Sequence, residues 1–419
     1  MRIYLTNLGC KLNQAELEKL ARQFLAAGHH VVGSLEEADV QVVNTCTVTH
    51  GAARTSRKVA RRGRRARPGL KTVLTGCYVN EDPERAAALA AVDLVVPNQR
   101  KDGLVAAVEE AFGVDPATTP LPIPYVPLDF GNTRALVKVE DGCNMRCSFC
   151  IIPFTRGPQR SRSLEDCVAE VRALAEGGYR EIVVTGVQIS SYRDGEHRLF
   201  HLVRAMLEET PVERLRLTSI APWQLDRRLL GLLGQRRLCR HFHFSLQSGC
   251  SATLRRMRRP YTVEGFAELV EEVRERIPGV AVTTDVIVGF PGETEEEFEQ
   301  SLAFVGAMGF AKAHIFPYSS RPGTAAARMA APVDPSVLRR RMSRMLAAAR
   351  EGEELFRASQ VGSRGTVLFE ASKDGLWQGL TDNYVRVFAR SEESLYNRLL
   401  PATLTGLTQG GLLGTPRVA

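Results

Sequence analysis

The sequence predicts a mixed α/β protein in three parts: an open parallel α/β domain, a central partial (β/α)6 barrel, and a small C-terminal all-β barrel. Apolar, β-branched runs alternate with helical patterns through most of the chain, which is typical of parallel sheets covered by helices. A proline-rich stretch interrupts this alternation and indicates a stiff linker. After residue 358 only short strand patterns with glycine turns remain, which favours a small barrel.

The predicted boundaries follow from these changes of pattern. We expect an N-terminal domain at 1–113, a linker at 114–132, a central domain at 133–358 and a β domain at 359–419. With 44% hydrophobic and 24% charged residues, the composition is ordinary for an enzyme, and the net charge of +8 favours an acidic partner such as nucleic acid. The chain begins with a strand pattern and contains no apolar run of membrane-spanning length, so we expect a cytoplasmic protein without a membrane partner.

The N-terminal domain is expected to alternate strands and helices. Strands are predicted at Arg2–Leu8, Val40–Val43, Thr72–Thr75 and Asp93–Val96, and helices at Leu12–Ala27, between Cys46 and Pro68, at Pro83–Ala91 and at Gly103–Phe112. Cys10, Cys46 and Cys77 each come just after one of the first three strands. Because the carboxyl ends of parallel strands form one edge where ligands bind, we expect these thiols to converge there. Three separate buried thiols are the alternative.

The predicted helix after Cys46 carries dense positive charge. Its basic residues are Arg54, Arg57, Lys58, Arg61, Arg62, Arg64 and Arg65. The expected packing face consists of Ala52, Ser56, Val59, Gly63 and Ala66. A solvated surface helix normally mixes both signs of charge, whereas this one has no acidic residue between Arg54 and Arg67, so phosphate binding is favoured. The candidate RNA contacts are Arg54, Arg57, Lys58, Arg61, Arg62 and Arg65.

A second series of strand–helix units follows the linker. Strands are predicted at 135–140, 181–186, 214–219, 241–246, 281–288 and 312–317, with helices between them, for example Leu164–Glu176 and Thr262–Ile277. Such a series predicts an incomplete barrel, whose active site is expected at the carboxyl ends of the strands.

Three cysteines with close spacing follow the first of these strands: Cys143, Cys147 and Cys150. Soft thiolate ligands select iron–sulfur clusters or zinc, and a structural zinc site would need a fourth close ligand, which the neighbouring sequence lacks. Three cysteines on a cluster leave one iron open for another ligand. Polar residues and glycines at the other strand ends are candidate cofactor contacts: Thr185, Gly186, Gln188, Ser245, Gln247, Ser248, Gly289 and Gly292.

The Cys-x3-Cys-x2-Cys loop after the first strand of a partial barrel resembles the radical S-adenosylmethionine (SAM) superfamily. The resemblance implies a [4Fe–4S] cluster on Cys143, Cys147 and Cys150, with SAM bound at its open iron. One-electron reduction of SAM then yields a 5′-deoxyadenosyl radical, a step that belongs to the cofactor while the protein aims it.

Longer segments resemble the methylthiotransferases of that superfamily. These segments are Leu8–Gln14, Asn44–Thr49, Thr75–Tyr78, Asp141–Phe154 and Arg156–Arg162. The resemblance implies a second [4Fe–4S] cluster on Cys10, Cys46 and Cys77, which handles the inserted sulfur. It also implies a sulfur source and a flavodoxin- or ferredoxin-like electron donor.

Two features most resemble the subgroup that modifies tRNA at N6-threonylcarbamoyladenosine: Asn44–Thr49 with the arginine-rich helix, and Thr381–Tyr384. This implies insertion of a methylthio group at carbon 2 of that nucleoside, in the anticodon loop of tRNA. Alternatives are the same chemistry on N6-isopentenyladenosine or on a ribosomal protein, and a non-catalytic RNA-binding protein with metal sites.

The C-terminal part begins with a basic helical segment at 333–358. Strands are predicted after it at Gly365–Glu370, Leu376–Leu380, Tyr384–Phe388 and Ala402–Thr405. Short strands of this kind indicate an OB-like barrel that resembles the TRAM module, which implies RNA contact, and a purely stabilising barrel is the alternative.

Several other residues have structural interpretations. Cys167 is expected in a helix core, and His241 and His243 alternate on a strand as packing residues do. Trp223 and Trp377 suit either a core or base stacking. The segment Arg255–Arg259 suits either a solvated loop or a phosphate or cofactor contact.

Overall fold

The computed structural model describes residues 1–113, 133–232 and 237–417, so the predicted linker at 114–132 lies outside the described residues. The chain forms two compact units, which we call the N-terminal unit and the C-terminal unit. The N-terminal unit comprises the described residues of Met1–Val126, together with Asp141–Arg160 and Ser319–Ala327, and the C-terminal unit comprises the remainder. The loop with Cys143, Cys147 and Cys150 therefore belongs to the N-terminal unit. The predicted domain boundaries stay a prediction.

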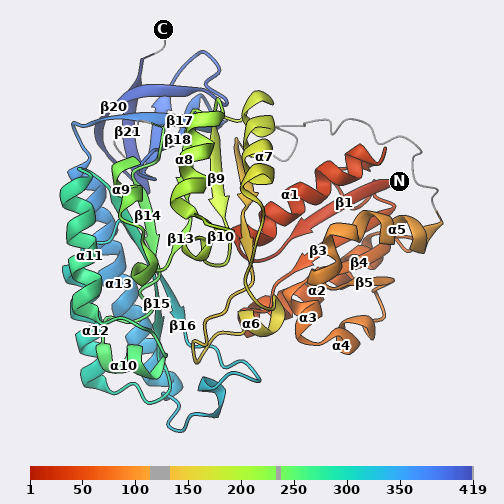
Figure 1. The fold of residues 1–419 in the computed structure, drawn as a ribbon, viewed down its shortest axis with the longest axis horizontal. Helices are drawn as coiled ribbons and strands as arrows, with labels where there is room; N and C mark the ends of the chain where they lie inside the picture. Colours follow the sequence, from red (N-terminus) through yellow and green to blue (C-terminus); the bar gives the residue numbers. More distant parts are fainter. Residues whose placement is uncertain (114–132, 233–236, 418–419) are drawn as a thin grey trace. The chain divides into compact units, whose positions relative to one another are not determined.

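The N-terminal unit is built on a parallel sheet in the order β2-β1-β3-β4-β5 (Figure 1). The strands are β1 Arg2–Asn7, β2 His30–Val31, β3 Val40–Thr45, β4 Lys71–Gly76 and β5 Leu94–Val96. The helices are α1 Lys11–Ala26, α2 His50–Ala66, α3 Cys77–Glu81, α4 Pro83–Ala87, η1 (a 3-10 helix) Asn98–Gly103, α5 Leu104–Phe112 and α6 Ile152–Thr155. The predicted open parallel α/β arrangement is confirmed.

Helices cover both faces of this sheet because neighbouring apolar residues of each strand point to opposite sides. Val42 and Val73 pack with α1 and α5, whereas Val43 and Leu74 pack with α2 and α3. The predicted helix Pro83–Ala91 ends at Ala87, and the short elements α3 and β2 were not predicted. Pro83 separates α3 from α4 because proline cannot continue a preceding helix, and the Asp82 side chain caps α4.

The C-terminal unit contains two parallel sheets, β12-β9-β6 and β13-β14-β15-β16. Their strands are β6 Arg134–Lys138, β9 Glu181–Thr185, β12 Arg214–Leu217, β13 Ser219–Ile220, β14 His241–Phe244, β15 Ala281–Val288 and β16 Lys312–Pro317. Only Thr218 separates β12 from β13, so the two sheets continue one another as the predicted partial barrel. The helices are α7 Leu164–Glu176, α8 Leu199–Glu209, α9 Arg228–Leu232, α10 Ser251–Arg256, α11 Val263–Arg276, α12 Glu295–Ala307 and α13 Pro335–Ser359.

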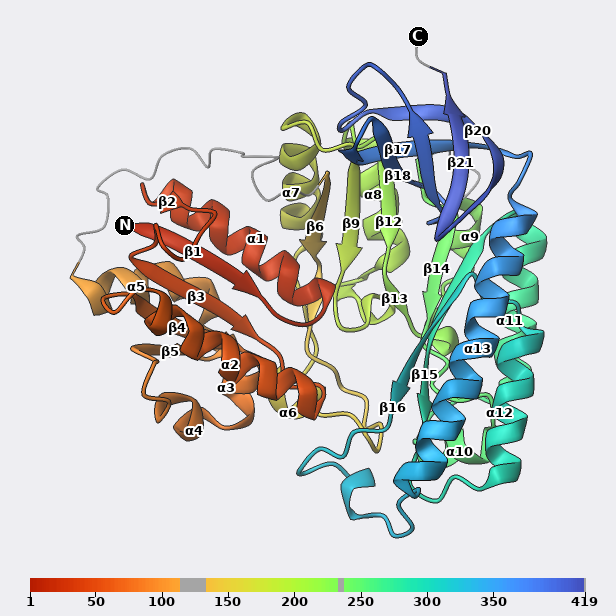
Figure 2. The same cartoon turned by 180° about the vertical axis from the view of Figure 1, so that it is seen from behind.

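Short elements complete this part of the chain. They are β7 Glu140–Asp141, β8 Arg160–Ser161, η2 Ile189–Ser191, β10 Arg193–Asp194, β11 His197–Arg198, η3 Pro222–Gln224 and η4 Ala326–Arg328. Helix α13 lies beside α12 and runs along β15 and β16 (Figure 2). Phe244 of β14 packs edge-on against Phe266 of α11, so the alternate residues His241 and His243 face away from the helices.

The C-terminal strands close into a barrel in the order β17-β18-β19-β21-β20. Its strands are β17 Arg364–Lys373, β18 Leu376–Thr381, β19 Arg386–Arg390, β20 Leu399–Thr408 and β21 Gly411–Pro416. The predicted small barrel is confirmed, and β21 was not predicted. Its core includes Val367, Phe369, Val387 and Leu404.

Buried arginines dock this barrel on the partial barrel. Glu181, at the start of β9, accepts hydrogen bonds from Arg214 Nε at 2.5 Å and Arg216 Nε at 2.6 Å. The same guanidinium groups donate to the main-chain carbonyls of Leu380 at 3.0 Å and Thr381 at 3.1 Å. The segment Thr381–Tyr384, which resembles a subgroup motif, thus lies against the amino-terminal ends of β9 and β12.

Candidate metal and cofactor sites

Cys10, Cys46 and Cys77 lie at the carboxyl ends of three neighbouring strands. Cys10 follows β1 and precedes α1, Cys46 follows β3, and Cys77 begins α3 after β4. The backbone approaches closely here, because a Cβ on Gly9 would stand 2.9 Å from Cys46 Sγ, and Gly9 has φ +105°. Burial, with smaller contributions from Cys77 and Cys10, raises the pKa of the Cys46 thiol to about 11. The structure thus brings these three cysteines to one edge of the sheet.

Cys143, Cys147 and Cys150 share one loop of the N-terminal unit, and all three are half-buried. The Cys143 N–H donates to the Gly157 carbonyl at 3.1 Å, and the Cys150 N–H to the Cys147 carbonyl at 3.2 Å. A Cβ on Gly142 would stand 2.1 Å from the Pro158 carbonyl oxygen, so this position requires glycine. The loop is therefore held by the chain that follows it.

The donor set of both triads suits iron–sulfur chemistry. All nine cysteines lie in the described residues and none forms a disulfide. Within the described ranges, no three His, Cys, Asp or Glu side chains are arranged to hold a single metal ion. Each triad offers three thiols, and thiolate is the ligand type that iron–sulfur clusters take in proteins.

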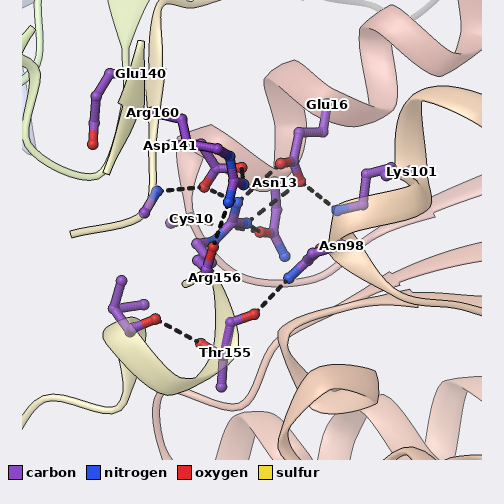
Figure 3. A network of polar contacts seen from close by, with 12 residues as sticks. Cys10, Asn13, Glu16, Asn98, Lys101, Glu140, Asp141, Thr155, Arg156 and Arg160 are labelled. Atoms are coloured by element: carbon purple, nitrogen blue, oxygen red, sulfur yellow. Dashed lines mark hydrogen bonds and ion pairs between the residues drawn. The ribbon is translucent and has the colours of Figure 1, made fainter. Parts of the chain in front are cut away.

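A buried polar network connects the segments that carry the two triads (Figure 3). Arg156, whose side chain is 1% exposed, donates to Glu16 Oε1 at 2.9 Å and Asp141 Oδ1 at 2.8 Å. It also donates to Asn13 Oδ1 at 2.5 Å, an oxygen that lies 3.9 Å from Cys10 Sγ. Burial opposes the charge, but Cys77, Glu16 and Asp141 outweigh it and raise the pKa of Arg156.

Further residues of this network were missed by the sequence analysis. Lys101 donates to Glu16 Oε2 at 2.6 Å and to Asn44 Oδ1 at 3.1 Å. Arg321, 3% exposed, donates to Thr47 Oγ1 at 2.7 Å and pairs with Glu81. No local pattern marks Lys101 or Arg321, because each meets its partners only through the fold.

The predicted cofactor contacts of the C-terminal unit lie at strand ends. Gln188 donates its N–H to Glu140 Oε2 at 2.9 Å, and a Cβ on Gly186 would stand 2.6 Å from the same oxygen. A Cβ on Gly289 would meet Leu338 of α13 at 2.5 Å. Both glycines thus lie close to side chains of the same unit, and the φ of +78° at Gly289 favours glycine. Their cofactor contact stays a prediction.

The remaining candidates have local partners as well. Thr185 ends β9 and is buried, and Gly292 donates its N–H to the Ala331 carbonyl at 2.8 Å. The Ser245 carbonyl accepts from the Tyr261 hydroxyl at 2.8 Å. Gln247 has φ +73°, and the buried Ser248 hydroxyl accepts from the Cys250 N–H at 3.2 Å.

Helix α2 presents its basic residues to solvent. The basic residues on its exposed or half-buried surface are Arg54, Arg57, Lys58, Arg61, Arg62 and Arg65. Arg64 instead pairs with Asp93 at 2.8 Å. The packing face differs in part from the prediction: Ser56, Val59 and Gly63 lie on it as predicted. Ala53 and Ala60 also lie on it, whereas Ala66 is exposed. Every third or fourth residue is small because the helix lies close to the sheet, where a Cβ on Gly63 would overlap Gln41.

The other residues considered above have local partners in the structure. Cys167 is fully buried in α7, and burial raises the pKa of its thiol to about 12. His243 hydrogen-bonds Thr283 at 3.1 Å and Asp285 at 3.2 Å. In the arginine cluster 255–259, Arg256 pairs with Glu297 and Arg259 lies over the Trp223 ring at 4.6 Å.

No helix in the described ranges combines the length and hydropathy needed to span a bilayer.

Two family descriptions match the chain: the Radical SAM superfamily over residues 137–305 and the Uncharacterized protein family UPF0004 over residues 2–97. The radical SAM superfamily uses SAM and a [4Fe–4S] cluster, and the Cys143–Cys150 loop lies inside the matched range.

Relatives match nearly the whole chain. The threonylcarbamoyladenosine tRNA methylthiotransferase MtaB of Bacillus subtilis is 35% identical over 414 residues, covering 94% of this chain and 91% of the relative. The tRNA-2-methylthio-N(6)-dimethylallyladenosine synthase of Staphylococcus aureus is 31% identical, covering 97% and 83%. The radical SAM methyltransferase TsrM of Kitasatospora setae shares the fold at a TM-score of 0.57 and 17% identity, covering 78% and 76%. The chain thus belongs to the methylthiotransferase family of radical SAM enzymes.

Proposed function

We propose that this enzyme inserts a methylthio group at carbon 2 of N6-threonylcarbamoyladenosine in the anticodon loop of tRNA. The observation that carries the proposal is the similarity to MtaB over 94% of this chain. The exposed arginines of α2 support an RNA substrate. The enzyme would then act in the cytoplasm, where it meets tRNA.

We further propose that Cys143, Cys147 and Cys150 hold the cluster that serves SAM, and that Cys10, Cys46 and Cys77 hold a second [4Fe–4S] cluster. When bound, these groups supply the one-electron chemistry and the sulfur to be transferred. The chain itself holds the thiols in place: Gly142 keeps the first loop against Pro158, and Gly9 brings Cys46 close to the turn that carries Cys10. A flavodoxin- or ferredoxin-like electron donor and a sulfur source are the remaining partners.

The cofactor SAM is proposed to contact the strand ends of the C-terminal unit at the residues predicted above. Glu140 and Gln188 support this, because their hydrogen bond fixes the loop after β9 in one conformation. Buried Ser248 and Gly289 shape the neighbouring loops in the same way.

The tRNA is proposed to contact α2 through Arg54, Arg57, Lys58, Arg61, Arg62 and Arg65. These guanidinium and ammonium groups are suited to phosphates, whose binding releases counterions and falls with added salt. The modified adenosine must leave its stack to be reached, which a single-stranded loop permits.

A second candidate substrate is N6-dimethylallyladenosine, because one relative carries that name at 31% identity. Nucleoside analysis of tRNA from a strain lacking this protein separates the two. We expect 2-methylthio-N6-threonylcarbamoyladenosine to disappear while its unmethylthiolated precursor accumulates. Loss of the dimethylallyl product instead would assign the second substrate.

A further inference from the structure

Arg156 is a buried permanent cation in the segment that follows the Cys143–Cys150 loop. It lies six residues after Cys150, at the end of α6, and its side chain is 1% exposed. A buried arginine keeps its charge, since its pKa is far above any working pH. Burying that charge is unfavourable unless it is fully hydrogen-bonded, so the position of its partners is informative.

Those partners come from both cysteine-bearing segments (Figure 3). Asp141 lies two residues before Cys143 and also accepts the Gly142 N–H at 2.8 Å. Asn13 and Glu16 lie on α1, three and six residues after Cys10. The Arg156 guanidinium group therefore hydrogen-bonds to Asp141, just before the Cys143–Cys150 loop. It also hydrogen-bonds to α1, the helix that follows Cys10.

The partners are themselves fixed. Asn13 Nδ2 donates to the Leu8 carbonyl at 2.7 Å and the Thr45 carbonyl at 2.9 Å, the main chain just before Cys10 and Cys46. Lys101 Nζ donates a hydrogen bond to the second carboxylate oxygen of Glu16, Oε2, at 2.6 Å. The planar guanidinium group of Arg156, held by fixed acceptors, has one orientation. A lysine ammonium group in its place would not be oriented in this way.

The charge also lies near the N-terminal triad. Arg156 donates to Asn13 Oδ1 at 2.5 Å, and the same oxygen lies 3.9 Å from Cys10 Sγ. Positive charge close to a cluster favours its reduced form, because reduction adds one negative charge, and burial strengthens this effect.

We propose that Arg156 is a positioning residue that joins the two cysteine-bearing segments and raises the reduction potential of the cluster held by Cys10, Cys46 and Cys77. This rests on the proposed second cluster. Glu16 has the opposite effect on the potential, since it places a fixed negative charge in the same network. The two clusters thus share one electrostatic element, and a change at Arg156 alters a cluster whose ligands lie far from it in sequence.

The test uses the full-length chain with Cys143, Cys147 and Cys150 replaced by alanine, so that one cluster remains after anaerobic reconstitution. The midpoint potential is measured by redox titration followed by electron paramagnetic resonance. We expect Arg156→Gln to lower the midpoint potential and Glu16→Gln to raise it. Each variant should bind as much iron as the parent chain. Opposite shifts exclude a general loosening of the site, which would move both variants the same way.

Two variants complete the design. Arg156→Lys keeps the positive charge, so the midpoint potential of its cluster should stay close to that of the parent chain. This variant tests the charge even if Arg156→Gln assembles no cluster. Arg160→Gln is the matched control, because Arg160 is 46% exposed and lies 3.6 Å from the other oxygen of Asp141. We expect Arg160→Gln to leave the potential unchanged.

Equal potentials in the parent, Arg156→Gln and Glu16→Gln chains would overturn the inference while leaving the second cluster intact. A shift of the same size in Arg160→Gln would also overturn it, since the effect would then come from any arginine near Asp141. A parent chain that takes up no iron would instead overturn the second cluster itself, and the inference with it.

Discussion

Arg156 in the N-terminal unit and the pair Arg214 and Arg216 in the C-terminal unit are all buried, and each meets buried carboxylates. Arg156 bonds to side chains of two cysteine-bearing segments. Arg214 and Arg216 share Glu181 and then donate to main-chain carbonyls of the C-terminal barrel. The same chemical groups thus have different consequences: one network surrounds candidate metal ligands, and the other joins a small barrel to its neighbour. The neighbours of a buried charge, rather than its burial, indicate its role.

The largest expected effect separates the two cysteine triads by activity. Cys143→Ala should abolish 5′-deoxyadenosine formation from SAM, because the cofactor loses its cluster. Cys46→Ala should retain that formation and abolish methylthiolated nucleoside, measured in the same reconstituted reaction. The control is Cys167→Ala, a buried cysteine of α7 outside both triads, which should retain both products. If Cys46→Ala also lost 5′-deoxyadenosine, the division of roles between the triads would be wrong.

The next effect concerns stability of the C-terminal unit. Glu181→Ala leaves Arg214 and Arg216 without their carboxylate, and breaking a buried pair in this way costs about 3–5 kcal/mol of unfolding free energy. Both tryptophans, Trp223 and Trp377, lie in this unit, so their fluorescence in urea reports its unfolding. The matched control is Glu213→Ala, which removes an exposed partner of Arg180 and should cost far less. Equal losses in both variants would contradict a docking role for Glu181.

A smaller effect appears in acid. Burial opposes the charge on Glu181, but Arg214 and Arg216 outweigh it and hold the pKa of this carboxyl well below its usual range. A carboxyl with a lowered folded-state pKa stabilises the fold above its unfolded pKa, about 4.3, and loses that contribution as the pH falls further. The stability difference between the parent chain and Glu181→Gln should therefore shrink below about pH 4. A difference that grows in acid would reverse this assignment.

The smallest effect distinguishes two arginines of α2. Arg61 is exposed, whereas Arg64 is paired with Asp93 at 2.8 Å. If α2 contacts phosphates, Arg61→Ala should weaken tRNA binding and reduce the slope of log affinity against log salt by about one unit. Arg64→Ala should change the slope less, because its charge is already neutralised. Binding measured over a series of salt concentrations checks both, and identical slopes would argue against α2 as a phosphate contact.

The sequence predicted these regions to different extents. Cys143, Cys147 and Cys150 were recognisable because all three thiols lie within one short loop. Cys10, Cys46 and Cys77 were predictable because each follows a strand of a parallel sheet, whose carboxyl ends meet at one edge. The predicted packing face of α2 was partly wrong, since Ala66 is exposed. Small residues are a weak indicator of which face of a helix is buried.

Other features had no local pattern to reveal them. Lys101 and Arg321 are two of the 55 lysine and arginine residues of the chain, and nothing in the neighbouring sequence distinguishes them. The segment Thr381–Tyr384 resembled a subgroup motif, but its position against Arg214 and Arg216 follows only from the structure. The glycines at the strand ends of the C-terminal unit were predicted as cofactor contacts, and the structure adds that Gly289 has φ +78°, a conformation that favours glycine.

By itself, the sequence determined the fold class, the two cysteine triads and the family, because hydrophobic periodicity and short motifs are local properties of the chain. The tertiary structure alone decided which buried charges meet. Arg156 is separated from Glu16 by 140 residues, and Arg216 from Asp382 by 166. A buried ion pair depends on the position of both partners in space, so no pattern in either segment could have predicted it.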